Sequence, residues 1–172
     1  MLPPFKNEPL TDFSRPENED AFRSALDRVI AQVGQTYPLV LGGERIITER
    51  TTASLNPSRP QEAVGHFSSA SLEQADQAVA AAAQAFETWQ YVPAEERARY
   101  LLRAAAEMRR RKHEFSAIMV LEVGKSWVEA DADTAEAIDF LEYYARQAVR
   151  IADGTHLLTP YLPEQLGLDY IP

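Results

Sequence analysis

The feature that most constrains the fold is a long acidic helix, predicted over residues 127–153, that carries apolar side chains on two opposite sides. Ser126-Trp127-Val128-Glu129 forms a capping box at its start, and Gly154 is a natural stop. At about 100° per residue, the main apolar stripe consists of Trp127, Ala130, Ala137, Ile138, Leu141, Ala145, Ala148 and Val149. The opposite side centres on Glu136, whose neighbours one or two turns away are Ala132, Phe140 and Tyr143. A helix that is apolar on two sides normally lies between two bodies, so we expect further sequence or a partner to supply the second body.

Glu136 has two interpretations on this pattern. In the first, its carboxylate is solvated, as most acids are, and the aromatic side chains only shield the helix. In the second, Glu136 lines the mouth of a pocket and accepts hydrogen bonds there. Exposure of its apolar neighbours also predicts that the isolated chain self-associates.

The rest of the chain predicts a mostly α fold of about five helices with a small antiparallel β element. Capping boxes begin helices at Ser14 and at Ser71. Gly42-Gly43 lies between two short apolar runs, which signals a β-hairpin. The expected segments are an N-terminal extension with the first helix over 1–36, the β element over 37–69, a helical bundle over 70–154 and an extended connector over 155–172.

Composition excludes several classes of function. The net charge is −9 and cysteine is absent, so we expect no nucleic-acid partner and no thiolate, disulfide or cysteine metal site. The three histidines show no ligand spacing. No run reaches the roughly 18 apolar residues of a membrane span, and no secretory signal begins the chain, so we expect no membrane partner and a cytoplasmic location. Gly124-Lys125-Ser126 lacks the earlier glycine of a phosphate-binding loop, because position 119 is methionine.

Several segments resemble the aldehyde dehydrogenase family. SLNP and EVGKSW are typical of the family as a whole, and YPLVLGGERI and the terminal YIP occur in the expected order. EADADTAEAIDFLEYYAR favours the branch that oxidises L-glutamate γ-semialdehyde. The whole chain is similar to the N-terminal third of such an enzyme, and therefore to an incomplete part of its α/β fold.

The resemblance implies an NAD-dependent oxidation in proline degradation, by a cysteine thiolate that attacks the aldehyde. The nucleophile, the general base and the main NAD contacts of the family come from later sequence, so we expect this chain to be a fragment that is inactive alone. The implied partners are a small aldehyde substrate, the remainder of the dehydrogenase chain and, in the complete enzyme, further copies in a homo-oligomer.

Two sites are carried over by the resemblance. Glu136 and Phe140 match positions of the family's substrate pocket. Ser54, Leu55 and Glu122 match its monovalent-cation site, where two backbone oxygens and one acid would hold Na⁺. The simpler interpretation of these three residues is a strand end and an acid near a helix end.

Two other functions remain open. The chain could be a stand-alone, non-catalytic helical binding module that re-uses this fold. It could also belong to the dehydrogenase part of a bifunctional proline-oxidising protein, although we expect no preceding domain because a helix follows soon after Met1.

Overall fold

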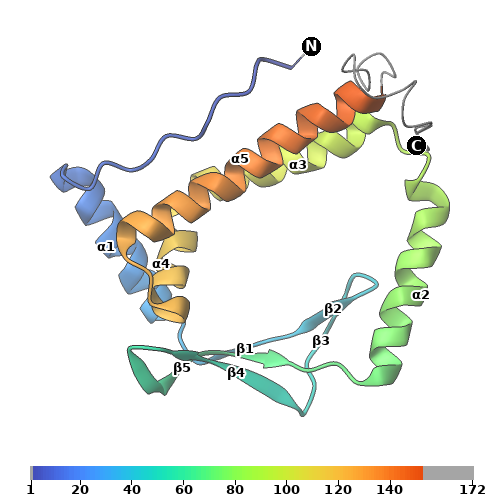
Figure 1. Cartoon of the computed structure of the whole chain (residues 1–172). Helices are drawn as coiled ribbons and strands as arrows, with labels where there is room; N and C mark the ends of the chain where they lie inside the picture. The colour runs from blue at the N-terminus through green and yellow to red at the C-terminus, as the bar shows by residue number, and fades with distance from the viewer. Residues whose placement is uncertain (1, 153–172) are drawn as a thin grey trace, which may run out of the picture. The chain divides into compact units, whose positions relative to one another are not determined.

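The computed structural model (Figure 1) describes residues 2–152, which form two compact units. The larger unit contains residues 10–91 and 111–134, and the smaller contains the described residues of 1–9, 92–110 and 135–172. The predicted segment 70–154 has residues in both units, and its packing as one bundle stays a prediction. The predicted connector over 155–172 lies outside the described residues.

The larger unit contains most of the elements. In chain order these are α1 (Pro16–Ile30), β1 (Gln35–Tyr37), β2 (Leu39–Leu41), β3 (Glu44–Ile46), β4 (Thr51–Asn56), β5 (Arg59–Ser68), α2 (Leu72–Trp89), α4 (Lys112–Val123) and the start of α5 (Trp127–Ala152). Strands β2 and β3 pair antiparallel around Gly42-Gly43, which confirms the predicted hairpin. Strands β4 and β5 form a second antiparallel pair.

One strand was not predicted. The exposed strand β1 pairs parallel with β5, so the sheet order is β1-β5-β4 and the β element is not purely antiparallel. Because all three residues of β1 are exposed, the strand has no apolar alternation from which sequence could identify it.

The core of the larger unit lies between α1 and α4. Phe22, Val29 and Ala117 are buried there. Phe22 contacts Phe13 and Trp127, with ring centroids 5.3 and 4.6 Å apart respectively. Apolar burial of this kind is the main stabilising contribution to a small domain, and these contacts join α1, α4 and the start of α5.

Helix starts follow the predicted capping boxes with one exception. At α2, the Ser71 hydroxyl accepts from the Gln74 backbone while the Gln74 side chain accepts from the Ser71 backbone. Ser126 and Glu129 make the same pair of bonds before α5. The cap predicted at Ser14 is wrong, because the Ser14 hydroxyl donates to Asp12 and α1 begins after Arg15 without a side-chain cap.

Helix α2 buries none of its residues, although its apolar side chains keep helical spacing. Its one substantial contact with another element is with strand β2. The pattern shows which side of α2 is apolar but not whether this chain covers it, so the bundle predicted to include α2 stays a prediction.

The smaller unit consists of α3 (Ala94–Arg110), residues 135–152 of α5 and the described N-terminal arm. Arg109 donates to Glu8 at 2.6 Å and to Glu142 at 3.2 Å. Asp139 accepts from the backbone of Glu8 at 2.6 Å. Arg109 of α3 therefore links the N-terminal arm to α5.

A buried ion pair in the larger unit holds the segment that precedes α1. Asp131 accepts from the Thr11 backbone at 2.7 Å, from the Thr11 hydroxyl at 2.6 Å and from Lys112 at 2.9 Å. The Lys112 and Asp131 side chains are only 11% and 2% exposed. Burial opposes ionisation of Asp131, but these hydrogen bonds and the Lys112 charge outweigh it and lower the pKa of the carboxyl.

We expect His113 to make the chain sensitive to mild acid. Its Nδ1 is buried and, in the part of the chain that the structure describes, has no hydrogen-bond partner. Burial lowers the pKa of His113 below 6.5; Asp131 opposes this shift, whereas Lys112 and Arg28 reinforce it. The unfolded chain therefore binds a proton more readily, so the free energy of unfolding falls as the pH drops from about 6.5 towards the folded pKa.

Substitution tests this expectation. His113→Phe keeps a ring beside Phe22 but removes the titration, so urea unfolding should show a flatter pH dependence between about pH 7 and 5 than in the unsubstituted chain. Equal slopes for the two proteins would assign the acid sensitivity to another group.

Candidate functional site

Glu136 and Phe140 both lie on α5 in the smaller unit. Glu136 is exposed, and Phe140 is 50% exposed. The Phe140 ring stacks on Tyr144 with centroids 5.9 Å apart and an angle of 19° between their planes. Among the residues that the structure describes, none forms a hydrogen bond or an ion pair with the Glu136 carboxylate, which is thus open to a ligand or to further sequence.

Phe140 contributes to an apolar groove between α3 and α5. The groove has a volume of about 390 Å³ and is lined by Leu101, Met108, Ala137, Phe140, Leu141 and Tyr144. Glu136 is not among the lining residues, but it precedes Phe140 by one helical turn on the same helix. The arrangement provides an apolar wall with a carboxylate one turn away, and that carboxylate can accept a hydrogen bond.

The structure brings together two of the three residues predicted to hold a cation. The Ser54 hydroxyl on β4 donates to Glu122 Oε1 on α4 at 2.7 Å. The pairing register of β4 with β5 is interrupted at Ser54/Leu55 and again at Leu55/Asn56. Such interruptions leave backbone groups without partners in the regular β-ladder. Backbone carbonyl oxygens and carboxylate oxygens are the ligands that hard cations prefer.

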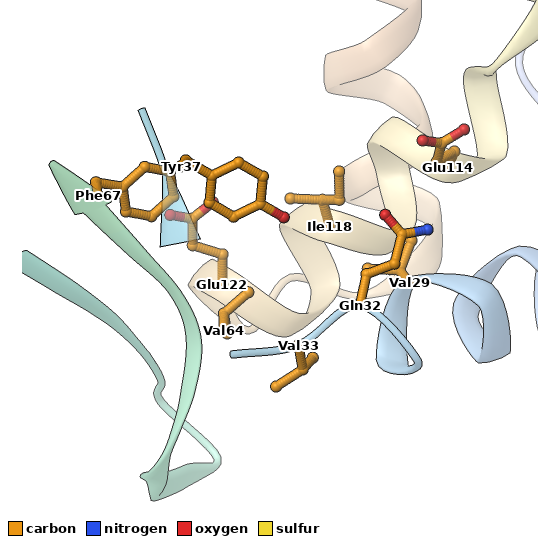
Figure 2. A pocket seen from close by; sticks show the side chains of 9 residues that line it. All are labelled: Val29, Gln32, Val33, Tyr37, Val64, Phe67, Glu114, Ile118 and Glu122. Carbon is orange, nitrogen blue, oxygen red and sulfur yellow. The ribbon is translucent and has the colours of Figure 1, made fainter. Parts of the chain in front are cut away.

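Glu122 also lines a cavity that sequence reasoning missed (Figure 2). The cavity has a volume of about 250 Å³ and is lined by Val29, Gln32, Val33, Tyr37, Val64, Phe67, Glu114, Ile118 and Glu122. Tyr37 and Phe67 stack with ring centroids 5.1 Å apart. A Cβ on Gly65 would lie 2.9 Å from the Tyr37 ring, so glycine is needed there. The arrangement depends on strand β1, which places Tyr37 beside Phe67 and has no apolar pattern in the sequence.

The sequence has no cysteine, so no thiolate can form a covalent adduct. Residues 2–152 contain no group of three or more histidine or acidic side chains placed to hold a metal ion. None of the helices in that range is both long and apolar enough to cross a bilayer.

The described strands do not show the strand–loop–helix order that is typical of a dinucleotide site. A nicotinamide dinucleotide normally binds where a parallel strand leads through a glycine-rich loop into a helix. The only parallel pairing between residues 2 and 152 joins β1 to β5, and β1 leads instead into the β2–β3 hairpin.

The described residues are mostly helical and carry a small mixed three-stranded sheet and a two-stranded hairpin, which defines a mostly α fold with a small β element. Residues 46–165 match the aldehyde dehydrogenase family, and the chain belongs to that family.

Its relatives are considerably longer. The chain is 59% identical over 154 residues to 1-pyrroline-5-carboxylate dehydrogenase of Bacillus pumilus (strain SAFR-032), covering 90% of this chain and 30% of the relative. It is 56% identical over 154 residues to 1-pyrroline-5-carboxylate dehydrogenase 2 of Bacillus subtilis (strain 168), with the same coverage. The chain thus spans 30% of the length of these relatives.

Solved structures give the same picture. The 1-pyrroline-5-carboxylate dehydrogenase from Thermus with bound NAD has a TM-score of 0.85 and 53% identity, covering 87% of this chain and 29% of that one. Proline utilization A from Bdellovibrio bacteriovorus has a TM-score of 0.83 and 38% identity, covering 86% of this chain and 15% of that one. These matches confirm that the fold is part of the aldehyde dehydrogenase fold.

Proposed function

We propose that this chain forms the N-terminal part of an NAD-dependent dehydrogenase that oxidises L-glutamate γ-semialdehyde, derived from 1-pyrroline-5-carboxylate, to L-glutamate in proline degradation. The observation that carries the proposal is the 59% identity, over 90% of the chain, to a relative with that name. The substrate carbon loses a hydride to NAD⁺ and gains an oxygen from water, with release of protons. The remaining sequence of the enzyme supplies the thiolate, the base and the NAD contacts.

Within that enzyme, Glu136 and Phe140 form one wall of the substrate pocket. Support comes from the exposed carboxylate of Glu136 and the apolar groove that begins one turn later at Phe140. The Phe140 ring excludes water, and the carboxylate accepts a hydrogen bond from the substrate or from groups around the nucleophile.

Ser54, Leu55 and Glu122 form a monovalent-cation site in the same proposal. Support comes from the Ser54–Glu122 hydrogen bond and from the irregular pairing of β4 at Ser54 and Leu55. The site strengthens the connection between β4 and α4 and is completed by oxygen ligands from further sequence or water.

Proline utilization A supports a second candidate, that the chain belongs to a bifunctional proline-oxidising protein. Its identity of 38% is lower than that of the Thermus enzyme, 53%, so we favour the separate dehydrogenase. A homo-oligomeric complete enzyme in the cytoplasm is part of the proposal and remains a prediction.

Turnover distinguishes an enzyme part from a non-catalytic module. The 172-residue chain, mixed with NAD⁺ and 1-pyrroline-5-carboxylate, should produce no NADH, because it has no thiol. A chimera that joins this chain to the remaining sequence of the Bacillus pumilus relative should produce NADH, measured at 340 nm. A folded but inactive chimera would contradict the proposal, as would NADH formation by the chain alone.

A further inference from the structure

The cavity of Figure 2 is formed entirely by the larger unit and has room for a small molecule. Its walls come from the end of α1 and the turn that follows, from β1, from β5 and from α4. Its volume of about 250 Å³ exceeds the roughly 150 Å³ in which a protein can hold benzene. A ligand of one small ring or a short hydrocarbon chain, about ten non-hydrogen atoms at most, would therefore fit.

Most of the cavity wall is apolar. Its aliphatic side chains are Val29, Val33, Val64 and Ile118. The rings of Tyr37 and Phe67 stack with 15° between their planes, and they add a flat apolar surface whose π-electrons also attract cations. The wall can therefore hold a hydrocarbon body.

One polar group in the cavity is available to a ligand. Figure 2 shows the Tyr37 hydroxyl pointing into the cavity, toward Ile118. Among residues 2–152, none donates a hydrogen bond to this hydroxyl or accepts one from it. A phenolic hydroxyl can do both, so it can bind a polar group of a ligand.

Two carboxylates line the cavity, and only Glu114 pairs with a cation of the described chain. The Arg111 Nε donates to it at 2.9 Å. Glu122 extends from α4 toward the stacked rings (Figure 2), and its Oε1 accepts only from the neutral Ser54 hydroxyl, at 2.7 Å. The described lining residues include no lysine, arginine or histidine. Because a partly buried charge is unfavourable unless it is paired, the Glu122 carboxylate favours a ligand that carries a positive charge.

We propose that this cavity binds a small organic amine in its ammonium form. The ammonium group pairs with Glu122 and donates to the Tyr37 hydroxyl, while the hydrocarbon body lies against the aliphatic side chains. Alkyl amines carry a proton at neutral pH, as the lysine side chain does. A neutral ligand of the same shape would leave Glu122 unpaired, and an anion would be repelled. Glu136 and Phe140 belong to the smaller unit, so this site is separate from the proposed substrate wall.

Three probes test the proposal by isothermal titration calorimetry of the 172-residue chain, at about pH 7.5 in a buffer without Na⁺ or other amines. Cyclohexylammonium supplies both the charge and a body of one ring. Cyclohexanol has nearly the same shape without the charge, and methylammonium has the charge without the body. We expect cyclohexylammonium to bind at least about tenfold more tightly than either of the others.

Variants assign the binding to this cavity. Glu122→Gln keeps the shape but removes the charge, so it should weaken cyclohexylammonium binding by about tenfold or more and change cyclohexanol binding by less than about twofold. Tyr37→Phe keeps the ring but removes the hydroxyl and should weaken the amine by about threefold. Glu49→Gln removes one charge from an exposed loop outside the cavity and should change the affinity for either probe by less than about twofold. The Tm of each variant checks that it is folded.

Each other outcome overturns the proposal. Equal affinities for cyclohexylammonium and cyclohexanol, or no binding of either, would show that the cavity does not select an amine. Methylammonium or Na⁺ binding as tightly as cyclohexylammonium would reduce the site to a cation site at Glu122 without the apolar wall. Unchanged amine binding in folded Glu122→Gln and Tyr37→Phe would place the amine elsewhere.

The chimera with the Bacillus pumilus sequence extends the test to a complete dehydrogenase. Amine binding by the 172-residue chain but not by the chimera would show that the remaining sequence fills the cavity, which would also overturn the proposal. The inference does not rest on the proposed function. An inactive chimera that binds cyclohexylammonium would contradict the dehydrogenase activity and retain the amine site.

Discussion

Replacement of Asp131 by alanine is expected to lower the free energy of unfolding by about 3–5 kcal/mol, the largest stability effect of a single substitution that we predict. The reason is that Lys112 would keep its buried ammonium, whose side chain is 11% exposed, without the carboxylate 2.9 Å away. The backbone N–H and hydroxyl of Thr11 would lose the same acceptor. Urea unfolding at pH 7, followed by circular dichroism, measures the change.

Asp133 provides the matched control, two residues further along the same helix. It pairs with Lys125, but both side chains are partly exposed, at 39% and 38%. Ion pairs in that environment typically contribute about 0–1 kcal/mol, so Asp133→Ala should have a small effect. Similar losses in the two variants would contradict the distinction between the buried and the exposed pair.

Acid should remove the stabilisation from Asp131 in a defined direction. Because the folded pKa lies below the ordinary value of 3.8, the stabilisation is present above that value and is lost as the pH falls through the lower folded pKa. Asp131→Asn cannot titrate, so its free energy of unfolding should fall less than that of the natural chain below about pH 4.

The amino-acid sequence predicts best those features of the fold that depend on residues close together in the chain. Capping boxes are local, and those at Ser71 and Ser126 appear as predicted. The Ser14 cap was wrong because Asp12, which is not part of the motif, binds the same hydroxyl. Thr11 and Lys112, which both bind the Asp131 carboxylate, lie 120 and 19 positions from it in the sequence. No periodic pattern of residues predicts contacts between such distant positions.

The candidate site shows the same limit. Helical periodicity placed Glu136 and Phe140 on one side of α5, and a local family motif pointed to Ser54 and Glu122, which do meet. The cavity beside Glu122 depends on β1 pairing parallel with β5, a contact between distant segments without a side-chain pattern. Local patterns therefore pointed to candidate ligands, whose role stays a prediction, whereas the surfaces that enclose the cavity could be seen only in the structure.

Glu136→Ala in the active chimera is expected to lower kcat/KM for 1-pyrroline-5-carboxylate by about tenfold to a hundredfold. That range corresponds to the loss of one hydrogen bond to a charged group, about 1.5–3 kcal/mol. A rise in KM at constant kcat would indicate that the carboxylate binds the substrate itself. A lower kcat, together with a changed rate of inactivation by iodoacetamide, would indicate that it acts through the surroundings of the nucleophile.

Two further variants separate these effects from a general loss of charge or stability. Glu136→Gln keeps an acceptor oxygen but removes the negative charge, so recovery of activity would indicate hydrogen bonding rather than charge. Glu96→Ala removes an exposed acid from α3 in the same unit and should leave kcat/KM within about twofold, as expected for an exposed residue away from the site. If Glu136→Ala kept the kcat/KM and the Tm of the unsubstituted chimera, Glu136 would have no role in the substrate pocket. Its carboxylate would then be simply solvated.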